Sequence, residues 1–335
     1  MMSLHDLREA SVRGARWIVE HQQEDGFFPS RTRVVESCYK GIWALNTLGY
    51  TTEASRLCRV VKTWIAADGD IPQPREEEAF LTTHYLYANT YLTIGAQTLG
   101  RFDVSQPLFR FIVTRQEPAW GGFISQGPLF QEAPCMDTVS TSISGLTALY
   151  MGDIEVAVKS AQFLQHVFDH QPNSKKMFYS TVDLDGRIVT EWTGEQTHRG
   201  IDINDPEQDW YFIGIATMFL PALFEATGDS SYLRLARSYL DYLDQVCCPG
   251  AFMDLSSGKS GVGAAYLYRL TEEPRYKEIA LAVADFIIGL QTPFGCWQES
   301  PQKDAPPPTD LTWSDMDMTA EYVLWLDQIH RHLSA

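Results

Sequence analysis

Two kinds of helical segment alternate along this chain. One kind has a charged face opposite an apolar face, as in residues 230–246 and 274–291. The other kind is apolar or small on most sides, as in residues 137–150 and 259–270. A helix that is apolar all round is buried, whereas a helix with one charged face lines the outside of a domain. The pattern therefore predicts alternating inner and outer helices.

Helical periodicity and turn residues predict twelve helices, paired in six hairpins. In chain order they are residues 4–22, 36–48, 51–67, 80–99, 104–116, 137–150, 153–169, 209–227, 230–246, 259–270, 274–291 and 315–332. This arrangement predicts an all-α fold, a double-walled (α/α)6 toroid that takes residues 1–335 as a single domain. An open helical solenoid is the alternative.

The loops between these helices fall into two length classes. Links from inner to outer helices are short, as at residues 151–152 and 228–229. Links from outer to inner helices are long, and residues 170–208 form the longest. Long loops in compact domains usually carry function. Since they all lead into inner helices, we expect a pocket at the N-terminal ends of those helices.

Composition excludes several classes of partner. The chain has 335 residues, of which 44% are hydrophobic and 21% are charged, as expected for a globular protein. Its net charge of −17 would repel nucleic acid and anionic membrane surfaces, so neither is an expected partner. No apolar run is long enough to span a membrane, and the amphipathic N-terminal segment lacks an apolar signal core. We expect a cytoplasmic protein that binds a small molecule, with a homodimer left open.

Motifs for cofactors are missing from the sequence. The six cysteines form no C-x-x-C pair, and no G-x-G-x-x-G, P-loop or G-x-S-x-G segment is present. The acidic segment 202–205 lacks the central glycine and bidentate glutamate of a calcium loop. No Cys and His set has the spacing of a zinc site. The sequence thus predicts no cofactor and no metal.

Three outer helices end in similar segments. Gln291-Thr-Pro-Phe-Gly295-Cys-Trp297 fits the pattern Q-x-x-x-G-x-W; residues 22–28 fit it with Phe for Trp, and residues 116–123 with one inserted residue. These segments resemble the QW repeats of triterpene cyclases and the related repeats of protein prenyltransferase β subunits. At a helix end, Gln can bond backbone groups, Gly turns the chain and the aromatic ring packs on the neighbouring hairpin. The motifs therefore support the toroid rather than a chemistry.

A second resemblance points to sugars. Residues 212–246 are similar to the hairpins of six-hairpin sugar enzymes, including glycosidases, unsaturated uronide hydrolases and sugar epimerases. Residues 259–291 match these hairpins less closely. Both resemblances imply the same fold, but they imply different reactions, and fold alone does not settle function.

The first turns of the inner helices supply the candidate catalytic residues. These are Asp317, Asp209, Asp137, His84, Asp315 and Cys135. An acid in such a turn is equally consistent with a helix cap. Converging carboxylates, however, raise one another's pKa and so provide both a protonated acid and an ionised base.

One of these turns resembles a known catalytic motif. Asp315-Met-Asp317-Met318 is similar to the D-x-D-D motif of class II terpene cyclases, except that Met318 replaces the last aspartate. The resemblance implies that Asp317 donates a proton. A cap plus a buried acid is the alternative. His84 fits a general base or a core histidine, and Cys135 precedes a helix start that would stabilise a thiolate.

Aromatic residues near the predicted pocket are candidates for substrate binding. They are Tyr39, Tyr85, Trp120, Trp192, Trp210, Tyr211, Trp297 and Trp313. Such rings suit an apolar polyene and stabilise carbocations, but they stack on sugar rings equally well.

The leading hypothesis is a cofactor-independent lyase, isomerase or cyclase in biosynthesis. Its substrate would be a small, largely apolar metabolite of terpenoid or polyketide type, with Asp317 or Asp209 as acid and Asp137 and His84 as base or orienting groups. The alternative is a carbohydrate-active enzyme: a glycoside or unsaturated uronide hydrolase, or a sugar epimerase. There, Asp137 and Asp209 would be the acid and base. A non-catalytic binding scaffold is the third reading.

Overall fold

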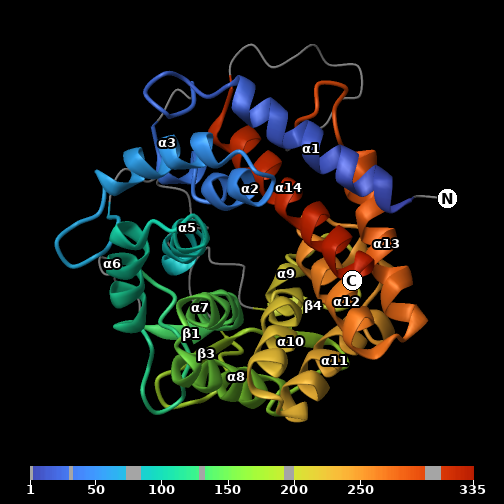
Figure 1. The fold of residues 1–335 in the computed structure, drawn as a ribbon. Helices are drawn as coiled ribbons and strands as arrows, with labels where there is room; N and C mark the ends of the chain where they lie inside the picture. Colours follow the sequence, from blue (N-terminus) through green and yellow to red (C-terminus); the bar gives the residue numbers. More distant parts are fainter. Residues whose placement is uncertain (1–2, 30–32, 73–83, 128–132, 192–199, 299–310) are drawn as a thin grey trace. The chain divides into compact units, whose positions relative to one another are not determined.

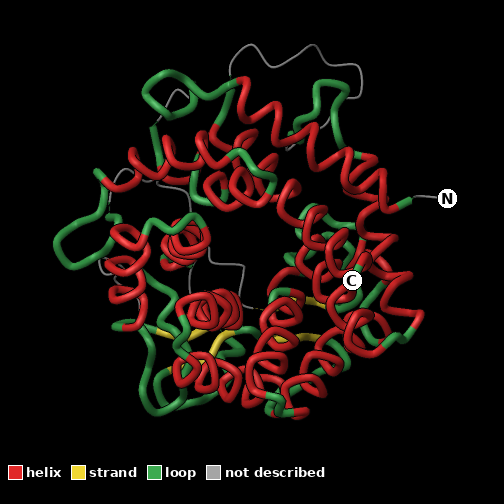
Figure 2. Tube along the Cα trace, in the orientation of Figure 1, coloured by secondary structure: helices red, strands yellow, loops and turns green. Residues whose placement is uncertain are grey.

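Helices joined by turns and loops make up most of the protein (Figures 1 and 2). The computed structural model describes residues 3–29, 33–72, 84–127, 133–191, 200–298 and 311–335. Its α-helices are α1 (Leu4–Glu20), α2 (Gly41–Thr47), α3 (Thr51–Lys62), α5 (Leu86–Thr98), α6 (Phe102–Val113), α7 (Thr138–Met151), α8 (Ile154–Asp169), α9 (Tyr211–Gly214), α10 (Ala216–Thr227), α11 (Ser230–Gln245), α12 (Gly258–Thr271), α13 (Pro274–Gly289) and α14 (Trp313–Ser334). The predicted helices are therefore present wherever the structure describes them.

Three predicted helices differ in detail. The helix predicted at 51–67 ends at Lys62. The segment predicted at 36–48 begins with the 3-10 turn η1 (Val35–Ser37), and α-helix follows only from Gly41. The segment predicted at 209–227 is divided into α9 and α10 at Ile215.

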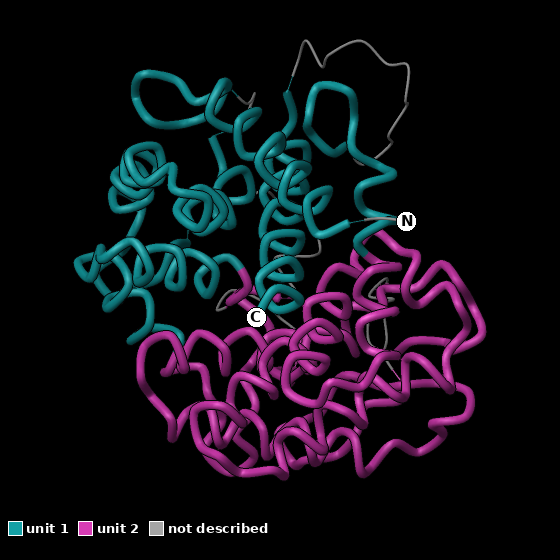
Figure 3. The backbone as a smooth tube through the Cα atoms, turned by 45° about the vertical axis from the view of Figure 1, so that its right-hand side comes forward, with its two compact units in different colours: residues 1–78, 88–112, 284–335 teal, residues 79–87, 113–283 magenta. Residues whose placement is uncertain are grey.

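The described backbone divides into two compact units, coloured separately in Figure 3. Unit 1 comprises Met1–Glu78, Ala88–Ile112 and Ala284–Ala335. Unit 2 comprises Ala79–Tyr87 and Val113–Val283. Within unit 1, α14 packs against α1 and α2, and within unit 2, α10 packs against α7, α11 and α12. The single domain expected from the sequence stays a prediction.

Burial separates the helices into the two expected kinds. In unit 2, α7 is buried from Thr138 to Ala148, and α12 is buried from Gly258 to Leu267. The neighbouring α8 and α11 bury only one stripe of apolar side chains. The all-round apolar helices are thus the inner ones, as their sequence pattern predicts.

Short polar turns separate inner from outer helices in unit 2. Gly152 ends α7 in the left-handed conformation, and the Asp153 carboxylate then accepts from the amide of Val156 in α8. Gly228 and Asp229 repeat this arrangement between α10 and α11. Each Gly-Asp pair stops one helix and caps the next, so the chain reverses within two residues.

The QW-type segments form one interaction three times. Each glutamine amide donates to the carbonyl of its own motif glycine and to a carbonyl in the next outer helix. The acceptor pairs, at 2.8 to 3.1 Å, are Gly26 and Glu53 for Gln22, Gly121 and Val156 for Gln116, and Gly295 and Ala10 for Gln291. The prediction that these glutamines bond backbone groups at helix ends is confirmed.

The motif glycines let the backbones approach closely. Gly26, Gly121 and Gly295 have φ of 91°, 77° and 97°, a region that disfavours other residues. An added Cβ would lie 2.8, 2.4 and 2.9 Å from the carbonyl oxygens of Arg56, Lys159 and Arg13. The turn therefore requires glycine for its conformation and for space.

Short strands lie where the sequence predicted only loops. Strand β1 (Cys135–Asp137) pairs antiparallel with β3 (Thr181–Asp183), and β2 (Met177–Tyr179) pairs with β4 (Gly200–Asp202). Three-residue strands are too short to give a period-two pattern above the background of a polar loop. Within the described part of the chain, no helix is both long and apolar enough to cross a membrane.

The contact between α10 and α12 predicts a sharp response to an added methyl group. A Cβ on Gly263 would lie 1.9 Å from Thr217 Oγ1 and 2.9 Å from the Thr217 carbonyl carbon. We expect Gly263→Ala to lower the free energy of unfolding by about 1–3 kcal/mol through overpacking. Gly289→Ala, where nothing lies within 4 Å of the new Cβ, is the control and should leave stability unchanged or raise it. Urea denaturation of both variants measures this, and equal effects would contradict it.

Candidate active site

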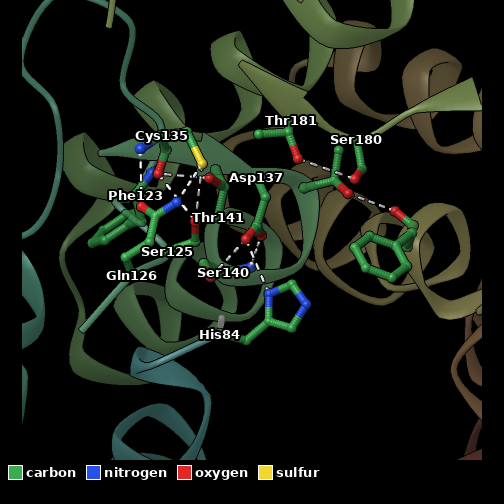
Figure 4. Close-up of polar contacts among 12 residues, drawn as sticks. His84, Phe123, Ser125, Gln126, Cys135, Asp137, Ser140, Thr141, Ser180 and Thr181 are labelled. Atoms are coloured by element: carbon green, nitrogen blue, oxygen red, sulfur yellow. Dashed lines mark hydrogen bonds and ion pairs between the residues drawn. The ribbon is translucent and has the colours of Figure 1, made fainter. Parts of the chain in front are cut away.

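The most buried acid–base pair among the described side chains of unit 2 is His84 with Asp137. The imidazole Nδ1 lies 3.0 Å from Asp137 Oδ2, and the two residues are 1% and 2% exposed (Figure 4). An ionised carboxylate only accepts hydrogen bonds, so Nδ1 donates the proton. In the neutral form of this imidazole, the basic lone pair is therefore on Nε2.

Asp137 is fixed from three directions. It is the last residue of β1 and the N-cap of α7, where its Oδ1 accepts from the Ser140 amide at 2.6 Å. The Ser140 hydroxyl adds a contact to Oδ2 at 3.3 Å. The backbone of Asp137 pairs with Thr181 in β3. The predicted cap is therefore present, and the same carboxylate also holds His84.

A short extended segment joins the two halves of the pair. The carbonyl of Ser125 accepts from the amide of Tyr85, the residue after His84, at 2.8 Å. The amide and hydroxyl of Ser125 both donate to the carbonyl of Cys135, at 2.9 and 3.1 Å. Ser125 therefore sets the spacing between the chain segments that carry His84 and Asp137.

Aromatic rings from α9 flank the imidazole. The rings of Phe212 and Tyr211 lie 5.3 and 6.5 Å from the His84 ring and stack on each other at 4.8 Å. Thr138, the first residue of α7, donates to the Phe212 carbonyl at 2.6 Å. The ammonium of Lys259, near the start of α12, lies 5.3 Å from the Tyr211 ring centroid. Four inner-helix ends thus contribute to this one cluster.

Asp209 lies at the edge of an open hollow of about 660 Å³. Glu207, Asp254 and Met253 also line it. The residue at the N-cap position of α9 is Trp210, one position after Asp209. Because Asp209 precedes Tyr211 by two residues, one segment links the hollow to the rings beside His84. A volume of this size suits a small organic ligand.

The candidate Cys135 has its own set of contacts. The Gln126 amide donates to its sulfur at 2.6 Å, and the Gln126 side-chain oxygen accepts from the Cys135 backbone amide (Figure 4). The Ser125 hydroxyl also lies 3.6 Å from the sulfur. These contacts account for Cys135 as part of the framework around β1.

Unit 1 holds a second charged cluster, around Asp317. The buried ammonium of Lys40 bonds Asp317 Oδ2 at 3.0 Å and Glu321 Oε2 at 2.5 Å. The Tyr39 hydroxyl donates to Asp317 Oδ2 at 3.0 Å, while the buried Oδ1 has no hydrogen-bond partner among the described residues. Burial raises the pKa of Asp317 to about 6, against the opposing effect of Lys40. A carboxyl group in this setting keeps its proton at pH values above its ordinary pKa.

The other candidates have structural partners. Asp315 forms a capping box with Thr312 at the start of α14, where Trp313 is the first helical residue. Trp297 and Trp210 are fully buried and donate to the carbonyls of Ile287 and Pro206. The Trp120 ring lies 4.8 Å from the His166 ring at an interplanar angle of 41°, and Tyr85 packs against Gly127. Trp192 lies outside the described residues.

Sequence reasoning missed several members of these clusters. Lys40, Glu321, Ser140 and Lys259 are not among the candidate site residues named from the sequence. A lysine inside an apolar segment, as in Cys-Tyr-Lys40-Gly-Ile-Trp, was an available signal, since lysine is rarely buried without a partner. Among the described residues, no group of three or more His, Cys, Asp or Glu is arranged to hold a metal ion.

Comparison with known proteins identifies the fold. No protein-family model and no curated protein matches the sequence. Several solved structures are similar, all at low identity. An inactive variant of an α-1,6-mannanase of Salegentibacter sp., in complex with α-1,6-mannotetrose, has a TM-score of 0.65 at 13% identity, with 97% of this chain and 99% of that chain covered.

Two further structures extend the comparison. A D-mannose isomerase has a TM-score of 0.64 at 13% identity, with 96% and 98% of the two chains covered. An unsaturated glucuronyl hydrolase specific for heparin has a TM-score of 0.63 at 10% identity, with 99% and 98% covered. These are (α/α)6-toroid enzymes. The fold is therefore an all-α (α/α)6 toroid, as the helix pattern predicts.

The expected terpenoid or polyketide cyclase or lyase is wrong. The similar structures are hydrolases and an isomerase that act on carbohydrates. The QW-type segments carry no chemistry, as expected from the sequence, because their glutamines, glycines and rings serve the helix ends of the toroid. The D-x-D resemblance misled the prediction, because Asp315 is a cap and Asp317 is tied to Lys40.

The raised pKa of Asp317 predicts a pH-dependent stability. The folded protein holds a proton on Asp317 that the unfolded chain releases above its ordinary value of 3.8, so stability falls as pH rises from 3.8 to about 6. Asp317→Asn removes this contribution. We expect the unfolding free energy of the wild type, relative to Asp317→Asn, to decline over that window and then level off. Urea denaturation at several pH values measures it, and a rise or a flat difference would contradict it.

Proposed function

We propose that the protein is a carbohydrate-active enzyme in which His84 and Asp137 carry out acid–base catalysis on a sugar. The observation that carries this proposal is the buried pair itself, with 3.0 Å between Nδ1 and Oδ2. Its position at two inner-helix ends matches the pocket end predicted from the loop lengths. The carbohydrate enzymes among the similar structures support a sugar as substrate.

The geometry of the pair suits a general base. The hydrogen bond to Asp137 fixes the tautomer of His84 and stabilises the imidazolium that forms when Nε2 takes a proton. Burial by Phe212 and Tyr211 keeps the pair away from bulk water, which strengthens the attraction between the imidazolium and the carboxylate. Asp137 in this scheme is a positioning residue that acts through His84.

Hydrolysis of a glycosidic bond is the reaction we propose first. It needs an acid that protonates the leaving oxygen and a base that activates water. His84 is the proposed base, and Asp209 is the proposed acid because it lines the open hollow and precedes by two residues Tyr211, whose ring lies beside His84.

Isomerisation of a free sugar is the second candidate. The mannanase variant is described as inactive after replacement of two consecutive aspartates, and no two aspartates are consecutive in this sequence. A histidine base could instead move a proton between two adjacent carbons of an aldose and a ketose, the kind of conversion an isomerase performs. The non-catalytic scaffold, the homodimer and the cytoplasmic location stay predictions.

Removing either member of the pair should abolish most of the activity. We expect His84→Gln and Asp137→Asn each to lower kcat by about 10²- to 10⁴-fold, the usual contribution of a positioned acid or base. The assay offers α-1,6-linked mannotriose, an unsaturated glucuronyl disaccharide and free D-mannose. His166→Gln, a histidine that contacts Trp120 and the Gly186 carbonyl, is the matched control and should retain wild-type rates.

The two reactions leave different products. Hydrolysis creates a new reducing end, whereas isomerisation keeps the number of reducing sugars and, in D2O, can introduce deuterium next to the carbonyl. Wild-type turnover rates in both His84→Gln and Asp137→Asn would contradict the proposed role of the pair. Absence of turnover and of binding across all three sugars would sink the proposed function.

A further inference from the structure

A small hollow in unit 1 is lined by positively charged and hydroxyl-bearing residues. Its volume is about 340 Å³, and its lining residues are Thr51, Thr52, Ser55, Arg56, Arg59 and Arg101. The first five belong to α3, and Arg101 directly precedes α6. No carboxylate is among these lining residues, so the hollow presents hydrogen-bond donors and positive charge.

Helical spacing brings most of these side chains to one face of α3. Residues 52, 55, 56 and 59 are three or four positions apart, the spacing at which side chains on a helix surface are neighbours. The opposite face is buried through Ala54, Leu57, Cys58 and Val61. The hollow therefore lies on the outward face of an outer helix.

Two of the three arginines have no partner within the described part of the chain. Arg56 and Arg59 are exposed, and their side chains form no hydrogen bond or ion pair there. Arg101 differs, because its Nε and Nη2 donate to the Asp103 carboxylate at 2.9 and 3.0 Å. Lys62 donates to the same carboxylate at 2.6 Å. Asp103 therefore compensates Arg101 and Lys62, whereas the two α3 arginines repel each other without compensation.

We propose that this hollow binds a phosphate group, with Arg56 and Arg59 as its principal ligands. The planar fork of a guanidinium donates two parallel hydrogen bonds to phosphate oxygens, and an anion held between two such groups cancels their repulsion. The threonine and serine hydroxyls of the lining add neutral donors.

The backbone at the start of α3 supports the same ligand. Thr51 and Thr52 are the first two residues of the helix, and the N-cap residue Tyr50 makes no side-chain cap bond. The amides of such a turn carry partial positive charge and favour an anion. They add to the arginines, which carry the full charges of the site.

The charge of the whole chain makes this hollow distinctive. A net charge of −17 repels anions from most of the surface, and it repels a polyanionic chain most strongly. Arginines gathered in one hollow without a carboxylate in its lining oppose that field locally. The volume of about 340 Å³ is at the lower end of the range for small-molecule sites. The ligand is therefore a small phosphate compound, either inorganic phosphate or a phosphate ester.

The hollow uses a different set of residues from the proposed active site. It lies where α2 and α5 end and where α3 and α6 begin, at the short turns 48–50 and 99–101. His84 and Asp137 instead lie at the starts of inner helices. The inference therefore goes beyond the proposed function and does not depend on it.

Calorimetric titration of the full-length protein with inorganic phosphate, D-glucose 6-phosphate and acetate tests the proposal, at constant ionic strength because salt screens exposed charges. The wild type should bind at least one of the two phosphate ligands saturably, and acetate about tenfold more weakly. Arg56→Gln/Arg59→Gln should weaken phosphate binding by about tenfold or more. Tighter binding of the sugar phosphate would identify an ester as the ligand, and equal binding would identify the phosphate group alone.

A matched control separates a specific site from general attraction to positive charge. Arg16→Gln/Arg110→Gln removes the same charge from exposed residues of α1 and α6 that do not line the hollow, and it should bind phosphate as the wild type does. Arg56→Lys/Arg59→Lys keeps the charge but lacks the fork, so its affinity should be intermediate. Circular dichroism checks that each variant is folded, and the lysine variant decides the matter if the glutamine variant is not.

Three results would overturn the phosphate site. They are the absence of saturable binding of either phosphate ligand, acetate binding as tight as phosphate binding, and equal losses in the two double glutamine variants. His84→Gln should bind phosphate as the wild type does, and a loss there would instead assign phosphate to the proposed active site. None of these failures touches the proposed function, which is tested by turnover of sugars.

Discussion

The glutamine amides at the ends of three outer helices are the interaction on which the rest of the structure depends. Each binds the turn that ends its own helix and a carbonyl of the next outer helix at once. The turn glycine lets the two backbones meet without a side chain between them. The inner helices begin beyond these turns, so the same bonds fix where an inner helix can start. Two inner-helix threonines complete the link, because Thr141 and Thr319 accept from the amides of Phe123 and Trp297.

The fixed start of an inner helix lowers the entropic cost of holding the His84–Asp137 pair in the core. Asp137 caps α7, and the hydrogen bond from the Ser140 amide fixes its Oδ1 independently of His84. The second oxygen is then oriented toward the imidazole at no further cost in side-chain freedom. A residue that serves as a helix cap thus also serves as the positioning group of a histidine. Structure and chemistry share one carboxylate, which explains why a cap and a catalytic acid could not be told apart in the sequence.

Much of the fold could be predicted from the sequence, because it follows from local rules. Apolar periodicity located the helices, and Gly152-Asp153 and Gly228-Asp229 marked their tight turns. The strands around Cys135 and Thr181 could not be predicted, because each is three residues long and pairs with a partner more than 40 residues away. The candidate site could be predicted from the sequence only in part. His84 and Asp137 were named separately, but their contact spans 53 positions and depends on the packing of the helices.

The wrong reaction came from taking the D-x-D segment, which holds a helix cap and a paired acid, for a catalytic motif, and not from the QW-type segments. Any toroid of helical hairpins can use a glutamine, a glycine and an aromatic ring to bond, turn and pack its helix ends, whatever reaction it catalyses. The side chains that distinguish one toroid enzyme from another lie at the inner-helix ends. There, this chain combines an imidazole, a carboxylate and a buried ammonium around Tyr211. That combination, rather than the repeats, carries the proposed sugar chemistry.

The most direct test of the central claim is a nitrogen-15 NMR titration of the His84 side chain with sugar. The account predicts an imidazole with a proton on Nδ1, since Asp137 accepts the hydrogen bond from that nitrogen. It also predicts a saturable shift of the Nε2 signal when an unsaturated glucuronyl disaccharide or mannotriose is added. A sugar that binds without shifting the Nε2 signal, or a histidine protonated on Nε2 in the free protein, would contradict the account.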